Sequence, residues 1–76
     1  MSENELRRCT LEFYECEHEG DMEMYTNDLE ASGFSTGRIE INHEAETGSV
    51  EISAPKDQWK ECLEKFKLTD AYGYLN

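Results

Sequence analysis

Alternation of apolar and polar residues predicts a β-hairpin in the middle of the chain. Apolar residues recur at every second position around Ile39–Ile41 and Val50–Ala54, and the polar segment 44–48 lies between the two runs. A loop of two or four residues puts all apolar pairs on one face, whereas a three-residue loop does so only if a bulge restores the phase. The predicted pairs are His43 with Val50, Ile41 with Ile52 and Ile39 with Ala54. His43 is therefore expected at the edge of the core.

Residues 8–17 have the same two-residue period and predict the first strand. One face would carry Cys9, Leu11 and Phe13. The other face would carry Thr10, Glu12, Tyr14 and Cys16. Because Cys9 and Cys16 would point in opposite directions, no disulfide between them is expected, and the three cysteines are interpreted as reduced thiols.

After this strand the apolar spacing changes to three or four residues, which predicts a helix. Met22, Tyr25 and Leu29 form its apolar seam, and Gly20-Asp21 is the expected N-cap. Gly33 is placed to end the helix in a left-handed conformation. A second helix is predicted after Pro55, and its buried seam is expected to hold Trp59, Cys62, Leu63 and Phe66.

The elements form a single α+β domain over residues 1–76, in the order strand, helix, strand, strand, helix. A right-handed crossover makes the first two strands parallel, and the hairpin inserts the third strand between them, which gives the sheet order 1-3-2 with both helices on one face. Residues 1–7 are expected to form an N-terminal arm. Residues 69–76 would form either a short fourth strand, as in a ferredoxin-like fold, or a tail packed on a helix, with Tyr72 and Tyr74 accessible.

Composition indicates a small, ordered core. Leu, Ile, Val and Phe make up only 13 of the 76 residues and the net charge is −11, but the aromatic content of 11% favours a folded domain. A chain of this length buries roughly 60% of its unfolded surface. A deep catalytic cleft is hard to build on such a core, so we do not expect an enzyme. The sequence shows neither a secretory signal nor an apolar run of about 18 residues, so we expect a cytoplasmic protein without membrane contact.

Negative charge is concentrated in one part of the sequence. Residues 9–37 contain eight acidic residues and no lysine or arginine, whereas residues 56–67 have a net charge of +1. Such a surface repels nucleic acid and anionic membranes and attracts a basic protein surface. In an extended segment, Glu15, Glu17 and Glu19 would recur about every 6.7 Å, close to the spacing of phosphates along a nucleic-acid strand.

These charges, with two exposed apolar side chains, define the candidate binding residues. The residues expected to contact a partner are Glu12, Tyr14, Glu15, Glu17, Glu19, Asp21, Glu23, Met24, Asp28 and Glu30. An acidic face that only keeps the protein soluble is the simpler alternative. Solubility explains the sign of the charge but not its separation from the second helix.

Metal binding and catalysis have weaker support in the sequence. Cys16 and His18 would face the same way on a strand, with Glu12 as a third ligand, but a closed zinc site needs four well-spaced ligands. As a nucleophile and base, Cys16 and His18 would stand about 6.7 Å apart, which is too far for a hydrogen bond. We therefore expect no metal, no cofactor and no catalytic residues.

Two classes of function remain open. The first is a non-enzymatic module that docks on a basic protein surface. In its most specific form it is an inhibitor that occupies the channel of a nucleic-acid-binding protein by charge mimicry. In size and charge, though in no motif, the chain resembles viral proteins that block host defence nucleases, of anti-CRISPR or anti-restriction type, which implies the host cytoplasm. The second is a small regulatory domain of ferredoxin-like type that senses a ligand or metal near Cys16 and His18. Either class allows a homodimer.

Overall fold

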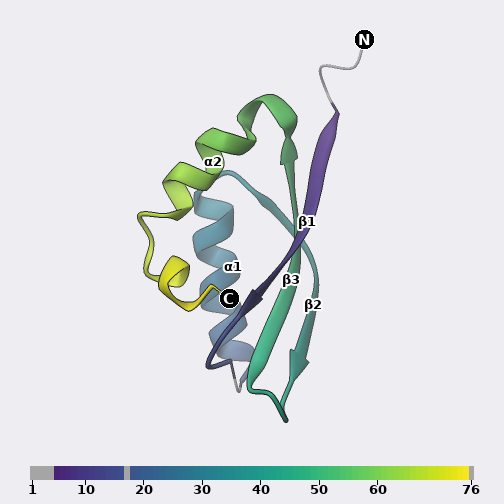
Figure 1. The fold of residues 1–76 in the computed structure, drawn as a ribbon, viewed down its shortest axis with the longest axis vertical. Coiled ribbons are helices and arrows are strands. Elements are labelled where there is room, and N and C mark those ends of the chain that lie inside the picture. Colours follow the sequence, from purple (N-terminus) through teal and green to yellow (C-terminus); the bar gives the residue numbers. More distant parts are fainter. Residues whose placement is uncertain (1–4, 17, 76) are drawn as a thin grey trace.

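Three antiparallel strands form a sheet in the order β1-β3-β2 in the computed structural model, which describes residues 5–16 and 18–75 (Figure 1). The elements are β1 (Leu6–Phe13), α1 (Glu19–Ala31), β2 (Ser35–Asn42), β3 (Thr47–Pro55) and α2 (Trp59–Phe66), with two short 3-10 helices, η1 (Lys56–Gln58) and η2 (Asp70–Tyr74). Both β1 and β2 pair antiparallel with β3, so they run parallel to each other and α1 crosses between them. The predicted α+β fold and sheet order are confirmed.

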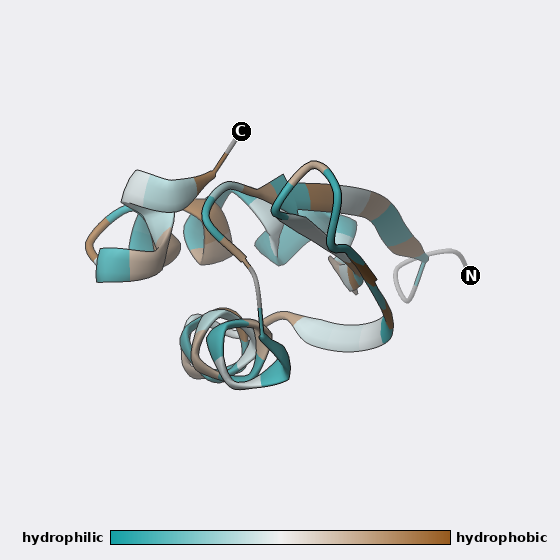
Figure 2. Cartoon of the chain, turned by 90° about the horizontal axis from the view of Figure 1, so that it is seen from below, coloured by the Kyte–Doolittle hydropathy of each residue, from teal (hydrophilic) through white to brown (hydrophobic). Residues whose placement is uncertain are grey.

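The core lies between one face of β3 and the helices. Alternate residues of β3 from Gly48 to Ala54 are buried, and the residues between them are exposed or half-buried. α1 packs against β2, and α2 packs against β3. Figure 2 looks along the long axis and shows α1 as a layer on one side of the sheet. Phe13 and Phe66 are fully buried at the centre. In the predicted seam of α2, Trp59, Cys62 and Phe66 are buried, whereas Leu63 is half-buried and packs against the core.

The hairpin register differs from the prediction by four residues. Ile39 lies opposite Val50 and Ile41 opposite Gly48, so the predicted partners are wrong, although the predicted faces are preserved. The cause is the position of the turn, which occupies residues 43–46, two residues earlier than the predicted register requires; the Asn42 side-chain oxygen accepts hydrogen bonds from the backbone N–H groups of Glu44 and Ala45 there. His43 therefore lies exposed in the turn rather than at the edge of the core.

A bulge further along the hairpin keeps the apolar faces in phase. The register of β2 against β3 shifts between Thr36 and Ile39, so Gly37 and Arg38 both face Glu51. Glycine suits the first of these positions, because a Cβ on Gly37 would lie 3.3 Å from a carboxylate oxygen of Glu51. The bulge falls in an edge strand, where extra residues are tolerated best.

The limits of the first strand also differ from those predicted. β1 begins at Leu6, inside the expected N-terminal arm, because Leu6 and Arg7 pair with Pro55 and Ala54. It ends at Phe13 rather than at residue 17, since Glu15 adopts a left-handed backbone with φ of 52°.

The tail does not form the fourth strand of a ferredoxin-like sheet. Residues 70–74 form η2, which packs against α1, and only Leu75 makes an isolated antiparallel bridge to Phe13. The alternative expectation, a tail packed on a helix, is therefore confirmed. Tyr72 and Tyr74 are 40% and 37% exposed, as expected.

Helix α1 begins slightly earlier than predicted and ends where predicted. Its N-cap is His18 rather than Gly20-Asp21, and the Asp21 carboxylate accepts a hydrogen bond from the His18 backbone N–H at 3.4 Å. At the other end Gly33 has φ of 112°, and the Phe34 N–H donates to the Leu29 carbonyl. Neither helix in the described ranges 5–16 and 18–75 has the length and apolar content needed to cross a bilayer.

Replacing Gly33 by alanine is expected to destabilise the fold by about 1–3 kcal/mol. The substituted residue would adopt an unfavourable positive φ, and its Cβ would lie 2.8 Å from the Cys62 sulfur. Gly20→Ala is the matched control at the other end of α1, because a Cβ there meets nothing within 4 Å. Urea unfolding of both variants measures the difference, and equal stabilities would contradict this explanation of how the helix ends.

Candidate protein-binding site

β1 ends, α1 begins and the β2–β3 hairpin turns at one end of the long axis of the molecule (Figure 1). Acidic side chains gather on these segments. Three surface depressions surround this end, and none is lined by lysine or arginine in the described part of the chain. Eight carboxylate side chains line them. We call this set the acidic end: Glu12, Glu15, Glu19, Asp21, Glu23, Glu40, Glu44 and Glu46.

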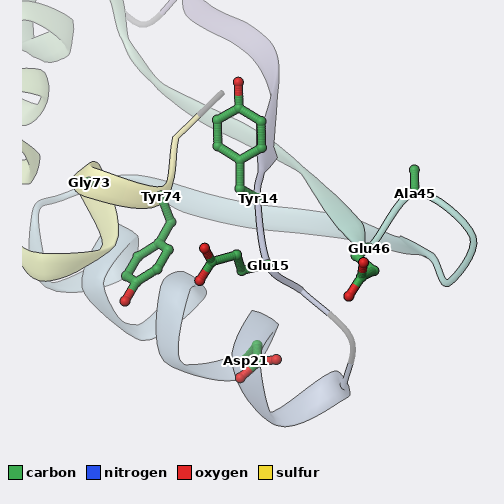
Figure 3. A pocket seen from close by; sticks show the side chains of 7 residues that line it. All are labelled: Tyr14, Glu15, Asp21, Ala45, Glu46, Gly73 and Tyr74. Atoms are coloured by element: carbon green, nitrogen blue, oxygen red, sulfur yellow. The ribbon is translucent and has the colours of Figure 1, made fainter.

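The first depression lies between the end of β1, the hairpin turn and the tail (Figure 3). It measures about 790 Å³, and the carboxylates of Glu15, Asp21 and Glu46 surround it together with Tyr14 and Tyr74. Figure 3 shows the Glu15 side chain on the same side as the Tyr74 ring and the Asp21 side chain on the first turns of α1. The depression is open, so its acids remain in contact with water.

Backbone hydrogen bonds hold the three segments of this depression together. The Cys16 N–H donates to the Glu46 carbonyl at 2.9 Å, and the Tyr14 N–H donates to the Tyr74 carbonyl at 2.8 Å. Glu15 and Glu46 both adopt left-handed backbone conformations, with φ of 52° and 56°. Such conformations are uncommon for residues other than glycine and cost energy, so the surrounding contacts keep these two acids in place.

The other two depressions continue the acidic surface to both faces of the domain. One lies on the open face of the sheet and is lined by Glu12, Glu40 and Glu44 among polar residues. The other lies between α1 and β2, where Glu19 and Glu23 border an apolar floor that includes Met22, Ile39 and Ile41. His43 lines both depressions, so the two surfaces meet at the hairpin turn.

Basic residues lie mainly at the other end of the strands or on α2. Arg7 stacks over the Trp59 ring at 4.8 Å, Lys56 pairs with Glu5 and Lys65 pairs with Glu61. Arg38 pairs with Glu40 of the acidic end at 3.3 Å. The carboxylates of Glu15, Glu19 and Glu23 have no ion pair with a described residue. Within the described residues, these three charges of the acidic end are therefore not compensated by an ion pair.

No protein-family model, curated protein or solved structure matches this chain. Its function is therefore inferred from the surface itself.

The predicted binding residues are only partly brought together. Glu12, Glu15, Glu19, Asp21 and Glu23 belong to the acidic end, with Tyr14 beside them and 50% exposed. Glu17 lies outside the described residues. The expected row of three extended acids is wrong, because Glu15 is left-handed and Glu19 is the first residue of α1.

The remaining predicted residues lie further along α1. Met24 is 49% exposed, Asp28 is half-buried and Glu30 accepts a hydrogen bond from the Thr36 hydroxyl at 2.6 Å. A helix rises about 1.5 Å per residue, so Asp28 and Glu30 are roughly 14–17 Å from the start of α1. They extend the acidic face of the helix but are not part of the acidic end.

Three residues of the acidic end were absent from the predicted set. Glu40, Glu44 and Glu46 come from β2 and the hairpin turn, and the fold brings them beside the loop that follows β1. Their signal was present in the sequence, since every charged residue of the segment 44–48 is acidic. Without the register, the position of that segment relative to α1 could not be assigned.

Cys16 and His18 do not form an exposed pair. Cys16 is fully buried, and its thiol faces the His18 carbonyl at 4.0 Å, whereas His18 is exposed at the N-cap of α1. The expectation that Cys16 shares an open strand face with Glu12 is wrong, because β1 has already ended and the chain has turned into the core. Among the described residues, no group of three or more histidine, cysteine or acidic side chains could hold a metal ion.

Burial raises the pKa of the Cys16 thiol, and the nearby Asp21 charge raises it further. The contribution of the neutral Cys16 thiol to stability is therefore fully present at pH values below the thiol pKa of the unfolded chain. It is lost as the pH rises through the thiol pKa of the folded protein. We expect the free energy of unfolding to fall in alkaline solution, above about pH 8.5. Urea unfolding under reducing conditions checks this. Cys16→Ala should reduce the alkaline fall in the free energy of unfolding, whereas Cys9→Ala, which removes an exposed thiol, should not. If the free energy of unfolding fell equally steeply with pH in both variants, Cys16 would not be its cause.

Proposed function

We propose that this protein is a non-enzymatic binding module whose acidic end docks on a basic surface of another protein. The observation that carries the proposal is the absence of lysine and arginine from all three depressions at that end, within the described residues. Solubility requires net charge but no particular arrangement of it. Grouping carboxylates at one end creates a directed field, which accelerates association with a basic partner and weakens as salt rises.

The shape of the acidic end suits a concave basic partner. The domain is elongated, 44 Å along its longest axis and 22 by 17 Å across. The acidic end carries carboxylates on the open face of the sheet and, on the opposite side of the domain, on the first turns of α1. A projection of this kind fits a groove better than a flat surface, because a groove can contact both faces at once.

Channels and grooves that bind nucleic acid are concave and positively charged, so the sharper proposal is an inhibitor that occupies such a channel. Its mimicry would come from carboxylates on β1, α1 and the hairpin rather than from a single extended segment. An anti-CRISPR or anti-restriction role in the host cytoplasm belongs to this proposal.

The test begins with affinity capture on the immobilised full chain, at low and high salt, followed by competition on the purified captured protein. We expect bound proteins to be basic, to elute as salt rises and to be displaced by DNA or RNA. Displacement by nucleic acid supports mimicry. A captured protein that binds this chain and nucleic acid at the same time would refute mimicry, and binding that does not weaken with salt would refute the proposed docking by charge.

A further inference from the structure

We propose that the depression between α1 and β2 is the anchor point of the acidic end, and that it binds one large apolar side chain, such as leucine, which a basic partner carries between lysine or arginine residues. The inference rests on the proposed function, because it names the kind of segment that docks at the acidic end. It adds a requirement for an apolar side chain, which docking by charge alone does not impose. The floor, the rim and the size of the depression support it.

The floor of this depression is apolar. Ile39 and Ile41 of β2 line it together with Met22 of α1. Ile39 lies opposite Val50, which is fully buried, and residues opposite each other in an antiparallel pair share one face of the sheet. The Ile39 side chain is therefore on the face that the helices cover, but it remains 44% exposed. The depression is thus a place where the apolar face of the sheet reaches solvent.

The polar side chain on this floor already has its hydrogen bond. Thr26 lines the depression and is only 8% exposed. Its hydroxyl donates to the Glu23 carbonyl at 2.9 Å, within α1. An apolar side chain can therefore cover Thr26 without leaving its hydroxyl unpaired, which avoids the cost of burying an unsatisfied polar group.

Two carboxylates on the α1 rim determine the charge that the ligand must carry. Glu19 and Glu23 are exposed, lie four residues apart and therefore share one side of the helix. Neither has an ion pair with a described residue. Like charges at this spacing repel each other, so a cationic group placed beside both is favourable. The rim therefore selects lysine or arginine next to the apolar side chain and repels nucleic acid and anionic membranes.

The size of the depression suits a single side chain. Its volume is about 500 Å³, and sites for small ligands measure roughly 300–1,000 Å³. An isolated exposed isoleucine is ordinary on a protein surface. Ile39 differs because it lies in a depression whose centre is apolar and whose rim is charged, which is the arrangement found around the residues that contribute most to binding at protein interfaces.

A second copy of this chain is the main alternative occupant. Leu68 is 88% exposed and follows Lys67, so it offers an apolar side chain beside a positive charge. Two chains of net charge −11 repel each other, however. An independent basic partner is therefore favoured, and the wild-type protein should sediment as a monomer.

Titration of the isotope-labelled full chain with defined peptides, followed by NMR, tests the proposal. The probes are Lys-Lys-Leu-Lys-Lys, its analogue with alanine in place of leucine, and Glu-Glu-Leu-Glu-Glu. The leucine peptide with lysines should shift the amide signals of Met22, Ile39 and Ile41. It should bind about fivefold or more tightly than the alanine peptide, because its side chain removes more apolar surface from water. The glutamate peptide should not bind.

Two sets of variants separate the apolar anchor from the charged rim. Ile39→Ser should remove most of the preference for leucine over alanine, whereas Leu6→Ser, which changes a similarly exposed residue of β1, should preserve it. The double variant E19Q/E23Q should weaken both lysine peptides by about threefold or more and leave their ratio unchanged. Circular dichroism verifies that each variant is folded.

The outcomes distinguish failure of the anchor from failure of the proposed function. Equal binding of the leucine and alanine peptides to the wild-type protein would overturn the anchor and leave docking by charge intact. If neither lysine peptide bound the acidic end, the proposed function itself would fail. Tight binding of the glutamate peptide, or an equal loss of both lysine peptides in Ile39→Ser, would also refute the anchor. So would a wild-type oligomer that Leu68→Ser converts to monomer, because a second copy would then occupy the depression.

Discussion

Phe13→Ala should remove about 3–5 kcal/mol from the free energy of unfolding, which is among the largest effects expected for a single substitution in this chain. Phe13 is fully buried, stacks on Tyr25 with ring centroids 4.6 Å apart and meets the edge of Phe66 at 6.3 Å. It thus joins β1 to α1 and α2. For a domain of this size the total stability is on the order of 4–11 kcal/mol, so the substitution removes a large part of it.

Urea unfolding followed by circular dichroism measures this loss. Phe13→Leu, which keeps most of the volume, should cost less than about 1.5 kcal/mol. Tyr14→Ala is the matched control, because it removes the adjacent aromatic ring from a half-exposed position. It should lower the free energy of unfolding by no more than about 1 kcal/mol. If the Phe13 and Tyr14 variants lost equal stability, Phe13 could not be the residue that joins the sheet to both helices at the centre of the core.

Reversing three charges of the acidic end should nearly abolish partner binding. Glu19, Glu23 and Glu44 are exposed and make no ion pair with the described residues, so their replacement by lysine leaves the core contacts unchanged. Each reversal replaces attraction to a basic surface by repulsion, worth about 1 kcal/mol or more. Together they should raise the dissociation constant by about a hundredfold or more.

Isothermal titration against the partner obtained by affinity capture measures this change, and circular dichroism verifies that the fold is retained. Asp21 is left unchanged because its carboxylate accepts the His18 N–H at the start of α1. A folded triple variant that binds with wild-type affinity would show that the partner uses another surface.

The sequence was sufficient to predict the faces of the strands but not their register. Val50 and Ile52 face the core as expected, because an apolar period of two is preserved by any even shift along the partner strand. For the same reason the period could not distinguish the predicted register from the observed one. The deciding feature was local, namely Asn42, whose side chain caps the turn and places it at residues 43–46, two residues earlier than predicted. The sequence alone does not show this role of Asn42, because the role depends on which residues close the hairpin.

The candidate site was predicted correctly where it is contiguous in sequence and missed where the fold assembles it. Glu15, Asp21 and Glu23 were identified because they belong to one long acidic segment. Glu44 and Glu46 joined them only through tertiary contacts such as the hydrogen bond from the Cys16 N–H to the Glu46 carbonyl. Conversely, Glu30 was predicted as a binding residue because it belongs to the same acidic segment. It lies outside the acidic end, because it is near the C-terminal end of α1.

The most direct test of a binding site at the acidic end separates the position of the charge from its amount. Asp57, Glu61 and Glu64 lie on η1 and α2, away from the acidic end, and their replacement by lysine changes the net charge by the same amount as the triple reversal of Glu19, Glu23 and Glu44. Titrated against the same basic partner at the same salt concentration, the α2 variant should retain an affinity within about fivefold of wild type, while the acidic-end variant loses about a hundredfold. Equal losses in the two variants would mean that only net charge matters, and would contradict a binding site at the acidic end.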